Sequence, residues 1–590
     1  MELKTYDFDS DNCELVGVEK HGKNWPVVYL IHNDTSMYIG ETNSFQNRFR
    51  QHLDNPNRKQ LTTISFVDDD EFNKSAVLDI EQGLIRLCGA DGKFRLQNRN
   101  AGQSGMHDYF ERARYERKIP EIWNGLRDLK LANQSYDDLV NSNLFKYSPY
   151  TTLTTEQNEV CYDVMCHILR ILGSGESGTS VINGSAGTGK TIVAIKLVDL
   201  LLNIASDEVS YEDDSWRESD AREEKGKWQK LISEWREYVK GNGKPKIAFV
   251  VPMESLRETL KQVFDGFGGR KMAAVVTSPS GVVLGRGSTL KEKFDVIVVD
   301  ESHRLKKRKA LSGGPDYTRF DTCCEKLGMR PETSNQLDWI VAQSRHRVLF
   351  YDSSQSVKPS DVSRLEYSEA ISRTLTETFS LRSQMRCKGG DDFLEYVKDV
   401  FDEDARPQKK RDFGDYDIRV FDDVGAMVQA IKERDAEKGL SRVVAGYSWY
   451  WATKGKRVDE IKQNGLFDIA IGPYRYCWNT TQKGWILSPN AINEIGCVHT
   501  TQGYDLNYVG LIFGKEIDYD ERSGKFRLDD NEFYDRNVKY GSTQEQMCIR
   551  ILNAYKVMMT RGIYGCYMYA CNPGMQKFLK KWFPSASGSA

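Results

Sequence analysis

The chain has 590 residues, far more than one hydrophobic core organises, so two or three domains are expected. Its 39% apolar content suits ordinary globular cores, and no apolar run approaches the roughly 20 residues of a membrane-spanning helix. A formal net charge of -3 gives no overall attraction to nucleic acid, so any such binding would depend on local basic surface.

The chain carries no sign of a targeting segment or a disulfide framework. Its first residues, MELKTYDFDSDNCELVG, are acidic and contain neither an apolar signal core nor an Arg-rich transit pattern. Twelve cysteines are scattered without a CxxC pair, and Cys323 and Cys324 are adjacent, which suits neither a zinc ribbon nor disulfide bonds. The sequence therefore predicts a cytoplasmic protein with reduced cysteines and no membrane partner.

Residues 1–105 have the pattern of a small α/β domain. Strands are expected at PVVYLI, MYIG and LTTISFV, and helices at SFQNRFRQHL and FNKSAVLDIEQGLIRL. The charged stretch DYFERARYERKIPEIWNGLRDLKLA that follows has a helical period. We expect it to form a helical linker over residues 106–150 that packs between the two halves of the chain.

From Leu153 onward, short apolar strands alternate with helices, a pattern typical of doubly wound parallel sheets. We expect a first lobe over 151–358, with a charged helical insertion at about 205–245, and a second lobe over 359–580. The expected strands, in chain order, are TSVING, KIAFVVP, AAVVTS, FDVIVVD, HRVLFYD, SRVVAGYS, GCVHTTQ, YVGLIFG and YGCYMYAC. The predicted fold class is α/β.

GSAGTGKT, residues 184–191, matches the phosphate-loop pattern G-x-x-x-x-G-K-[ST] between an apolar strand and an apolar helix. Gly184, Gly187 and Gly189 would let backbone N–H groups wrap a triphosphate. Lys190 would neutralise the β and γ oxygens, and the Thr191 hydroxyl would bind Mg²⁺. In this context an ordinary glycine-rich turn is a poor alternative.

Two later strands end in acidic residues. FDVIVVDESH ends in Asp300, which would hold Mg²⁺, and Glu301, which would polarise the attacking water. VLFYDSSQ ends in Asp352 and Gln355, placed to sense the γ-phosphate, although a polar turn after a strand remains an alternative there. The three motifs together predict hydrolysis of ATP with Mg²⁺.

The order of these motifs resembles that of superfamily 1 helicases. LTTEQ resembles the adenine-reading Q motif through Gln157, and VVPMESLRETL, YDSSQ, LRSQMRC, VHTTQGYDLNYVGLIFG and NAYKVMMTRGIYGCYMYAC resemble motifs Ia, III, IV, V and VI. RVVAGYSWYW and CNPGMQKFLKKW are most similar to the bacterial helicase domain related to Schlafen group 3 proteins. Tyr351 departs from the pattern, because motif III usually opens with Gly.

This resemblance implies two RecA-like lobes and a single-stranded nucleic-acid track. Arg386 and Arg561 would be arginine fingers from the second lobe, although a surface ion pair is the commoner role of an arginine. Gln502 and Gly503 of motif V would also contact the nucleotide. Candidates to contact the strand, most of which could equally be core residues, are His303, His499, Tyr504, Tyr447, Trp449, Tyr450, Trp451 and the run RLKKRK at 304–309.

VVYLIHNDTSMYIGETNSFQNRFRQH resembles the core of GIY-YIG nucleases. Tyr29 takes the first Tyr position, with Val27 where the family usually has Gly, and Tyr38, Ile39 and Gly40 form the second element. The remaining landmarks follow in order as Arg48, His52, Glu81 and Asn98.

The chemistry of phosphodiester cleavage accounts for this set of residue types. A tyrosine oxygen can take or relay a proton from water, Arg48 can neutralise the scissile phosphate, and Glu81 can hold one divalent cation, Mg²⁺ or Mn²⁺. His52 would be a second proton relay, or else a capping or solvent-facing histidine.

Together these features predict an ATP-dependent DNA nuclease with a helicase or translocase motor, of a kind found in bacterial defence against phage. DNA is the expected partner, and RNA, an oligomer or an accessory protein are left open. The alternatives are an ATP-driven sensor or remodelling switch whose N-terminal module only binds nucleic acid, and an RNA-directed helicase-nuclease.

Overall fold

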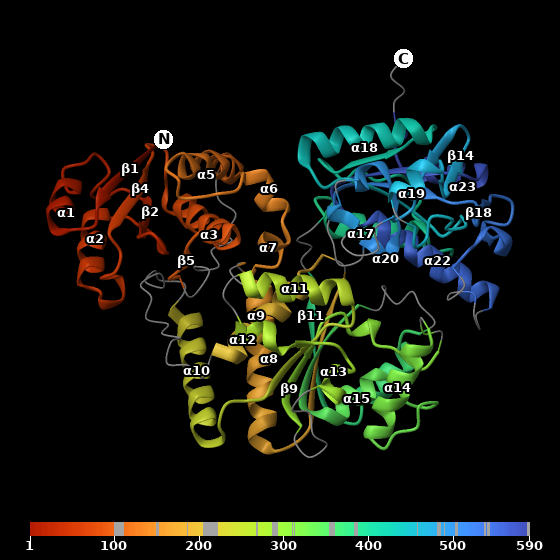
Figure 1. Ribbon diagram of the computed structural model, residues 1–590, viewed down its shortest axis with the longest axis horizontal. Helices are drawn as coiled ribbons and strands as arrows, with labels where there is room; N and C mark the ends of the chain where they lie inside the picture. The colour runs from red at the N-terminus through yellow and green to blue at the C-terminus, as the bar shows by residue number, and fades with distance from the viewer. Residues whose placement is uncertain are drawn as a thin grey trace. The chain divides into compact units, whose positions relative to one another are not determined.

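The computed structural model describes most of the chain (Figure 1). Outside the description are residues 99–110, 149–150, 152, 186, 204–221, 267–269, 286–292, 310, 312, 353–359, 383–386, 457, 481–484, 489, 502–505, 536–538, 540–542 and 587–590. The chain divides into two compact units, each built from separate segments. The first comprises Met1–Ser174, Thr191–Ile247 and Glu258–Val276, and the second Gly175–Lys190, Ala248–Arg257 and Thr277–Ala590.

The first unit begins with a five-stranded sheet in the order β1-β4-β2-β3-β5. Its elements are β1 Glu2–Asp7, α1 Ser10–Val16, β2 Val27–His32, β3 Ser36–Thr42, α2 Phe45–Asp54, η1 Pro56–Arg58, β4 Thr63–Asp68, α3 Lys74–Asp91 and β5 Arg95–Leu96. The strands expected at PVVYLI, MYIG and LTTISFV and both expected helices are confirmed. Strand β1 was not predicted, because the mostly polar run ELKTYD lacks the apolar alternation of a half-buried strand.

Both faces of this sheet are covered, which explains why β2 is apolar throughout. Val28 and Leu30 face a core built with α3, whereas Val27, Tyr29 and Ile31 face a second core built with α1 and α2. This alternation follows from the two-residue period of a strand. Antiparallel pairing of β2 with β3 sets Tyr29 opposite Gly40.

The segment expected to be a linker over 106–150 is part of the N-terminal domain. It contains α4 Arg112–Glu116, α5 Lys118–Asp128, α6 Tyr136–Asn141 and α7 Asn143–Lys146. Ile122, Trp123 and Leu126 of α5 are fully buried in the same core as α3, and the two helices lie side by side in Figure 1. The prediction of helix is confirmed, but the domain boundary at 105 is wrong, because these side chains complete the α3 core.

The rest of the first unit is helical. Its helices are α8 Thr155–Ser174, α9 Lys190–Asn203, α10 Arg222–Asn242, α11 Glu254–Gly266 and α12 Arg270–Val275. Helix α10 is the helical second half of the expected insertion. Trp228 and Trp235 on α10 are buried, and the Trp228 ring meets Tyr162 of α8 edge-on at 5.4 Å. The buried tryptophans of α10 therefore attach the insertion to the rest of this unit, with Trp228 contacting α8.

The second unit contains two parallel sheets, which confirms the predicted fold class. The first has the order β11-β6-β10-β9-β7-β8, and β6 pairs in parallel with both β10 and β11. Its elements are β6 Gly178–Gly184, β7 Ile247–Val250, β8 Val276–Thr277, α13 Gly281–Leu284, β9 Phe294–Val299, η4 Ser302–Arg304, α14 Gly314–Lys326, α15 Gln336–Gln343, β10 Ser344–Tyr351, α16 Arg364–Ile371 and β11 Leu375–Leu381. Helices α13 to α16 share a core with β6, β9 and β10 (Figure 1).

Two expectations for this first lobe need correction. The boundary after residue 358 is wrong, because β11 pairs along its whole length with β6 and so belongs to the first sheet. The strand expected at AAVVTS begins with the last three residues of α12, and only Val276 and Thr277 are strand. A run of four to six small apolar residues suits a buried helix turn as well as a strand.

The second parallel sheet has the order β12-β20-β17-β13-β16. This lobe contains α17 Gly390–Val400, β12 Asp417–Val420, α18 Val424–Lys438, β13 Arg442–Ala445, α19 Val458–Gln463, β14 Ile469–Ile471, β15 Tyr474–Tyr476, η6 Trp485–Leu487, η7 Ala491–Asn493, β16 Ile495–Gly496, α20 Val498–Thr501, β17 Leu506–Phe513, β18 Ile517–Asp520, β19 Lys525–Leu528, η8 Asp530–Glu532, α22 Gln544–Met559, β20 Gly562–Ala570 and α23 Pro573–Trp582. Strands β14 and β15, and likewise β18 and β19, form separate two-stranded antiparallel sheets. The strand expected at GCVHTTQ is wrong, because Val498–Thr501 is the short helix α20.

Strand β17 lies at the centre of this sheet and is buried at every position. Val509, Leu511 and Phe513 face a core shared with α17, α22 and α23, whereas Tyr508 and Ile512 face a core shared with α18. Helices on both faces of a parallel sheet are the doubly wound arrangement. None of the helices in the described part of the chain combines the length and apolar composition needed to cross a bilayer.

Candidate active sites

The phosphate loop joins the end of β6 to the start of α9. Gly187 and Gly189 have φ angles of 90° and 79°, in the left-handed region that favours glycine. A Cβ at Gly184 would collide with the Thr188 hydroxyl. The backbone of the loop therefore favours glycine at 187 and 189, whereas Gly184 leaves room for the side chain of Thr188.

Lys190 is buried and folds back onto its own loop. Its Nζ donates to the carbonyl oxygens of Gly184 and Ser185 at 2.6 and 2.8 Å and pairs with Asp352 Oδ2 at 3.2 Å. Strand β10 places Asp352 beside the loop because it is the neighbour of β6 in the sheet. The ammonium group of Lys190 is therefore held at the phosphate loop by oxygen atoms, where a triphosphate could exchange its own oxygens for some of these partners.

Asp300 and Glu301, the two carboxylates of the DESH segment that is called motif II below, follow β9. Asp300 is fully buried, and its Oδ1 accepts a hydrogen bond from the Glu301 N–H at 3.0 Å. Thr191 lies in the first turn of α9. A hydroxyl and a carboxylate are hard oxygen donors of the kind that bind Mg²⁺ beside a nucleotide, so these residues suit the predicted metal.

Glu301 has φ 50° and ψ 46°, a left-handed conformation that is uncommon outside glycine. Its Oε2 lies 2.9 Å from Nε2 of the fully buried His303. Burial alone would raise the pKa of Glu301, but the nearby His303, Lys190 and Arg304 outweigh that effect and hold the pKa below its ordinary value. Glu301 is thus kept ionised, the state in which it can polarise a water.

Tyr351, which replaces the usual Gly of motif III, has a packing role. Its ring lies 4.2 Å from that of Tyr367 and meets His303 edge-on. The Tyr367 hydroxyl is within 3.2 Å of Ser302 Oγ, which itself donates to the Phe350 carbonyl at 2.8 Å. The two tyrosines therefore support the loop that carries Glu301.

The other predicted nucleotide contacts divide into three groups. Gln355, Arg386, Gln502 and Gly503 lie outside the described residues. Arg561 is buried between α22 and β20 and is not on the surface. Gln157 accepts a hydrogen bond from the Thr154 N–H at 3.0 Å at the start of α8, so it helps to cap that helix.

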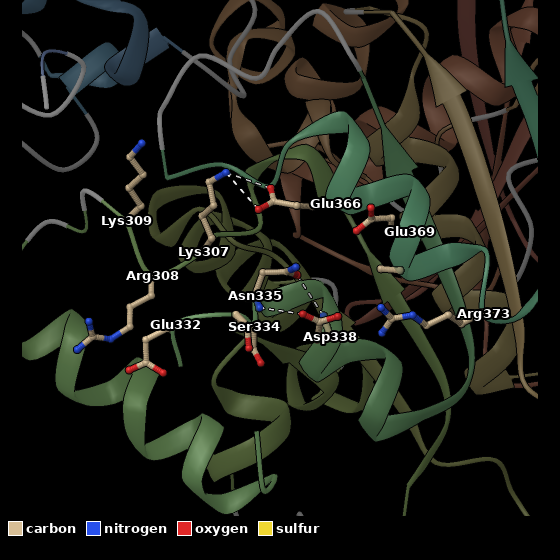
Figure 2. Close-up of a pocket in the computed structure, with 12 residues that line it drawn as sticks. Lys307, Arg308, Lys309, Glu332, Ser334, Asn335, Asp338, Glu366, Glu369 and Arg373 are labelled. Carbon is tan, nitrogen blue, oxygen red and sulfur yellow. Dashed lines mark hydrogen bonds and ion pairs between the residues drawn. The ribbon is translucent and has the colours of Figure 1, made fainter. Parts of the chain in front are cut away.

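The run RLKKRK at 304–309, a candidate to contact the nucleic-acid strand, has three of its five basic side chains paired with carboxylates. Arg304 is buried beside Asp361, Lys307 pairs with Glu366 at 3.0 Å, and Arg308 pairs with Asp321 at 2.6 Å. Figure 2 shows Lys307 reaching Glu366 across a polar pocket of about 370 Å³. Most of this positive charge is neutralised within the lobe.

The candidate aromatic residues are mostly core. His303 and Trp449 are buried, and Tyr447 and Trp451 pack against Trp478. Tyr450 is 68% exposed, so a nucleic-acid strand could reach its ring. Tyr504 and the side chain of His499 lie outside the description.

The N-terminal site is centred on the hydroxyl of Tyr29. It forms a hydrogen bond with Nε2 of His52 at 2.7 Å and accepts one from Nε of Arg48 at 3.2 Å. Residues from β2 and α2 therefore meet at one oxygen. Burial together with the charges of Arg48 and Arg58 lowers the pKa of His52 to about 3, so the imidazole is neutral near neutral pH. The alternative of a solvent-facing histidine is excluded, because His52 is buried.

Gly40 of the YIG element is required by this arrangement. A Cβ at Gly40 would collide with the Tyr29 hydroxyl and ring. Tyr38 lies beside it, with its ring 5.1 Å from His52 and 6.3 Å from Tyr29. Val27, which stands where the nuclease family usually has Gly, fits here because its side chain is buried in the core with α1 and α2.

Glu81 and Asn98 are both buried but differ in what they do. The charge of Glu81, on α3, is among the influences that raise the pKa of Tyr29, after burial as the main cause, so its carboxylate lies near the site. Asn98 accepts from the Ile39 N–H at 2.9 Å and donates to the Ile39 carbonyl at 2.7 Å. Asn98 thus holds β3 in place and acts as a positioning residue.

Sequence reasoning missed one residue of this site. Arg58 in η1 lies with its guanidinium carbon 3.8 Å from the centre of the Tyr38 ring. The surrounding NPNRKQ has the composition of an exposed turn, and nothing in the local sequence shows that it folds back over the strands.

Residues 178–572, from the first strand of the phosphate-loop sheet to the end of the second sheet, match the family described as Schlafen group 3, DNA/RNA helicase domain. That is more than half of the chain. The chain belongs to this family. The Schlafen group 3 helicase domain thus includes the phosphate loop, both motif II carboxylates and Arg561, and gives the chain a helicase-type ATPase that uses ATP with Mg²⁺.

The chain is also similar to uncharacterized protein YPL245W of Saccharomyces cerevisiae, with 22% identity over 492 residues that cover 78% of this chain and 97% of the relative. Among solved structures, Bacteroides Pif1 bound to ssDNA is 11% identical, covering 72% of this chain and 94% of that chain, with a TM-score of 0.25. A DEAD box protein from Methanococcus jannaschii is 10% identical, covering 73% and 94%, with a TM-score of 0.23. Family membership rests on the sequence match.

Proposed function

We propose that this chain couples an ATP-driven nucleic-acid motor to a phosphodiester-cleaving site in its N-terminal domain. The observation that supports cleavage most directly is the hydroxyl of Tyr29, held between a neutral histidine and an arginine. A core tyrosine with only a structural role needs one polar partner. Here the partners are a proton acceptor and a phosphate-binding cation, as cleavage requires.

A proton relay follows from this geometry. Burial raises the pKa of Tyr29 well above its ordinary value, so a free phenolate is a poor resting state. Neutral His52 can take the phenol proton while the Tyr29 oxygen takes a proton from the attacking water. Arg48 would neutralise the scissile phosphate, and a divalent cation held by Glu81 would supply charge stabilisation at the leaving oxygen.

The motor half follows the chemistry of phosphoryl transfer. Gly184, Gly187, Gly189 and Lys190 would hold the phosphates, and Thr191 with Asp300 would hold Mg²⁺. Glu301 would polarise the attacking water while Asp352 and Gln355 sense the γ-phosphate. Arg386 and Arg561 would act as arginine fingers, with Gln157, Gln502 and Gly503 as further nucleotide contacts.

DNA is the substrate we propose, with a single strand as the track of the motor, and RNA is the competing outcome of the same assays. The relative in yeast shows that similar chains are not confined to bacteria. A role in defence against phage therefore remains a prediction from the combination of a nuclease with a motor.

Two single substitutions separate the activities. Glu81→Ala should abolish cleavage and retain nucleic-acid-stimulated ATP hydrolysis, whereas Lys190→Ala should abolish hydrolysis, because each removes a charge that only one reaction uses. The measurement is cleavage of linear, circular and single-stranded DNA and RNA with Mg²⁺ or Mn²⁺, beside phosphate release from ATP. Wild-type protein that hydrolyses ATP but cuts none of these substrates would establish a binding-only N-terminal module. Unchanged turnover in Lys190→Ala would refute the motor assignment.

A further inference from the structure

We propose that Arg58 binds a backbone phosphate of the strand being cut, next to the scissile bond, as a second arginine of the N-terminal site. The inference rests on the proposed nuclease function and names a substrate contact beyond the residues assigned so far. Arg58 ends the short helix η1 and covers the ring of Tyr38, whose neighbour across the site is His52.

The local sequence fixes Arg58 in this position. Asn55 caps η1 by accepting a hydrogen bond from the Asn57 N–H at 2.9 Å, and Pro56 presets the first helical φ. Nη1 of Arg58 donates to Oε1 of Gln97 at 2.5 Å. Gln97 precedes Asn98, which is itself bound to both backbone groups of Ile39. The guanidinium is thus held by Gln97 and by the Tyr38 ring in the absence of substrate.

The charge of Arg58 has no carboxylate partner within the described residues, and its buried Nε has no hydrogen-bond partner there. By contrast, Arg50 of the same domain pairs with Glu14 at 2.7 Å. The charge of Arg58 helps to lower the pKa of His52, so its field reaches the proton relay. A guanidinium that faces an aromatic ring and a neutral histidine is stabilised when an anion joins it.

A phosphodiester is the anion that we expect Arg58 to bind. Arg48 already donates Nε to the Tyr29 hydroxyl, at the point where the water would be activated. Arg58 lies on the side of Tyr38 and therefore would contact a phosphate further along the strand. Its planar fork can donate two parallel hydrogen bonds to phosphate oxygens. The competing explanation is that Arg58 only clamps η1 and Gln97 onto β3.

The test uses the full chain and single-turnover cleavage of a labelled oligonucleotide, once the cut position has been mapped. Arg58→Ala should slow cleavage by about 10- to 100-fold, the value of a charge-assisted hydrogen bond. The salt dependence of log(kcat/KM) should become shallower by just under one unit, because one phosphate contact is lost. Arg58→Lys keeps the positive charge but lacks the planar pair of donors, so its cleavage rate should lie between those of wild type and Arg58→Ala. Arg50→Ala, which removes an exposed paired arginine, is the matched control and should change neither quantity.

A chemical substitution identifies the contact itself. Replacing single phosphates beside the cut with neutral methylphosphonates should slow the wild type at one position, and Arg58→Ala should be insensitive at that position. Nucleic-acid-stimulated ATP hydrolysis should be the same in all variants, which reports an intact fold. An Arg58→Ala protein that matches Arg50→Ala overturns the inference while leaving the nuclease in place. The inference is also overturned if Arg58→Ala cleaves slowly but is slowed by the methylphosphonate as much as wild type is. In that case the arginine only holds η1 and Gln97 in place. Wild-type protein that cuts nothing overturns the proposed function and this inference with it.

Discussion

At the scale of single residues, protonation in the N-terminal site is decided by neighbours. Burial, Arg48 and Arg58 lower the pKa of His52 from 6.5 to about 3. Since the folded value lies below the unfolded one, the stability contributed by neutral His52 is present above pH 6.5 and is lost as pH falls toward 3. His52→Gln cannot be protonated, so wild type should lose stability relative to this variant between pH 7 and 4.5. Urea unfolding at both values measures the difference, and parallel losses in the two proteins would contradict a buried neutral histidine.

At the scale of elements, a buried polar cluster joins three segments of the second lobe. Glu516, after β17, accepts hydrogen bonds from Tyr555 of α22 at 2.5 Å and from Ser448, after β13. The Tyr555 oxygen also accepts from the Gly514 N–H at 2.8 Å. A cluster of this kind is costly when one member is left unsatisfied.

Tyr555→Phe should therefore destabilise the second lobe by about 1 to 3 kcal/mol, because it removes a donor from a buried carboxyl. Burial raises the pKa of Glu516 above 4.5, so the stability linked to its neutral form is present below that pH and is lost as pH rises. The stability of Glu516→Gln relative to wild type should thus increase as pH rises. Thermal unfolding across pH 4 to 8 measures both effects, with the exposed Tyr534→Phe as control. Equal melting of Tyr555→Phe and Tyr534→Phe would show that the cluster contributes nothing.

At the scale of the whole molecule, Tyr29 of the proposed nuclease site and Lys190 of the phosphate loop belong to different units of the chain, yet one polypeptide carries both. A tethered nuclease works at a high effective concentration on the strand that the motor holds. Glu301→Gln should trap ATP with nucleic acid and change the rate or pattern of cleavage, although it leaves the N-terminal site untouched. Cleavage time courses with ATP, a non-hydrolysable analogue or no nucleotide measure this coupling. Identical time courses for wild type and Glu301→Gln under all three conditions would mean that the two sites work independently.

The features that sequence alone determined are those whose chemistry is local in the chain. The phosphate loop is eight consecutive residues, and the left-handed φ angles of Gly187 and Gly189 are what its spacing implies. Long apolar strands such as FDVIVVD were predicted correctly for the same reason. Short runs failed, because a few apolar residues suit a strand or a helix turn equally. GCVHTTQ therefore contains the helix α20, and β11 was found only through its pairing with β6.

The tertiary structure decided which distant side chains meet, because strand register and helix packing are set by the whole core. Only the pairing of β2 with β3 reveals that Gly40 must lack a side chain to admit the Tyr29 hydroxyl. Only the fold of η1 onto β3 brings Arg58 to the site, and only the adjacency of β6 and β10 brings Asp352 to Lys190. Sequence supplied the residue types for ATP hydrolysis and for the proposed phosphodiester cleavage. Burial and contact then set their protonation states, since a group's pKa depends on neighbours that lie far away in the chain.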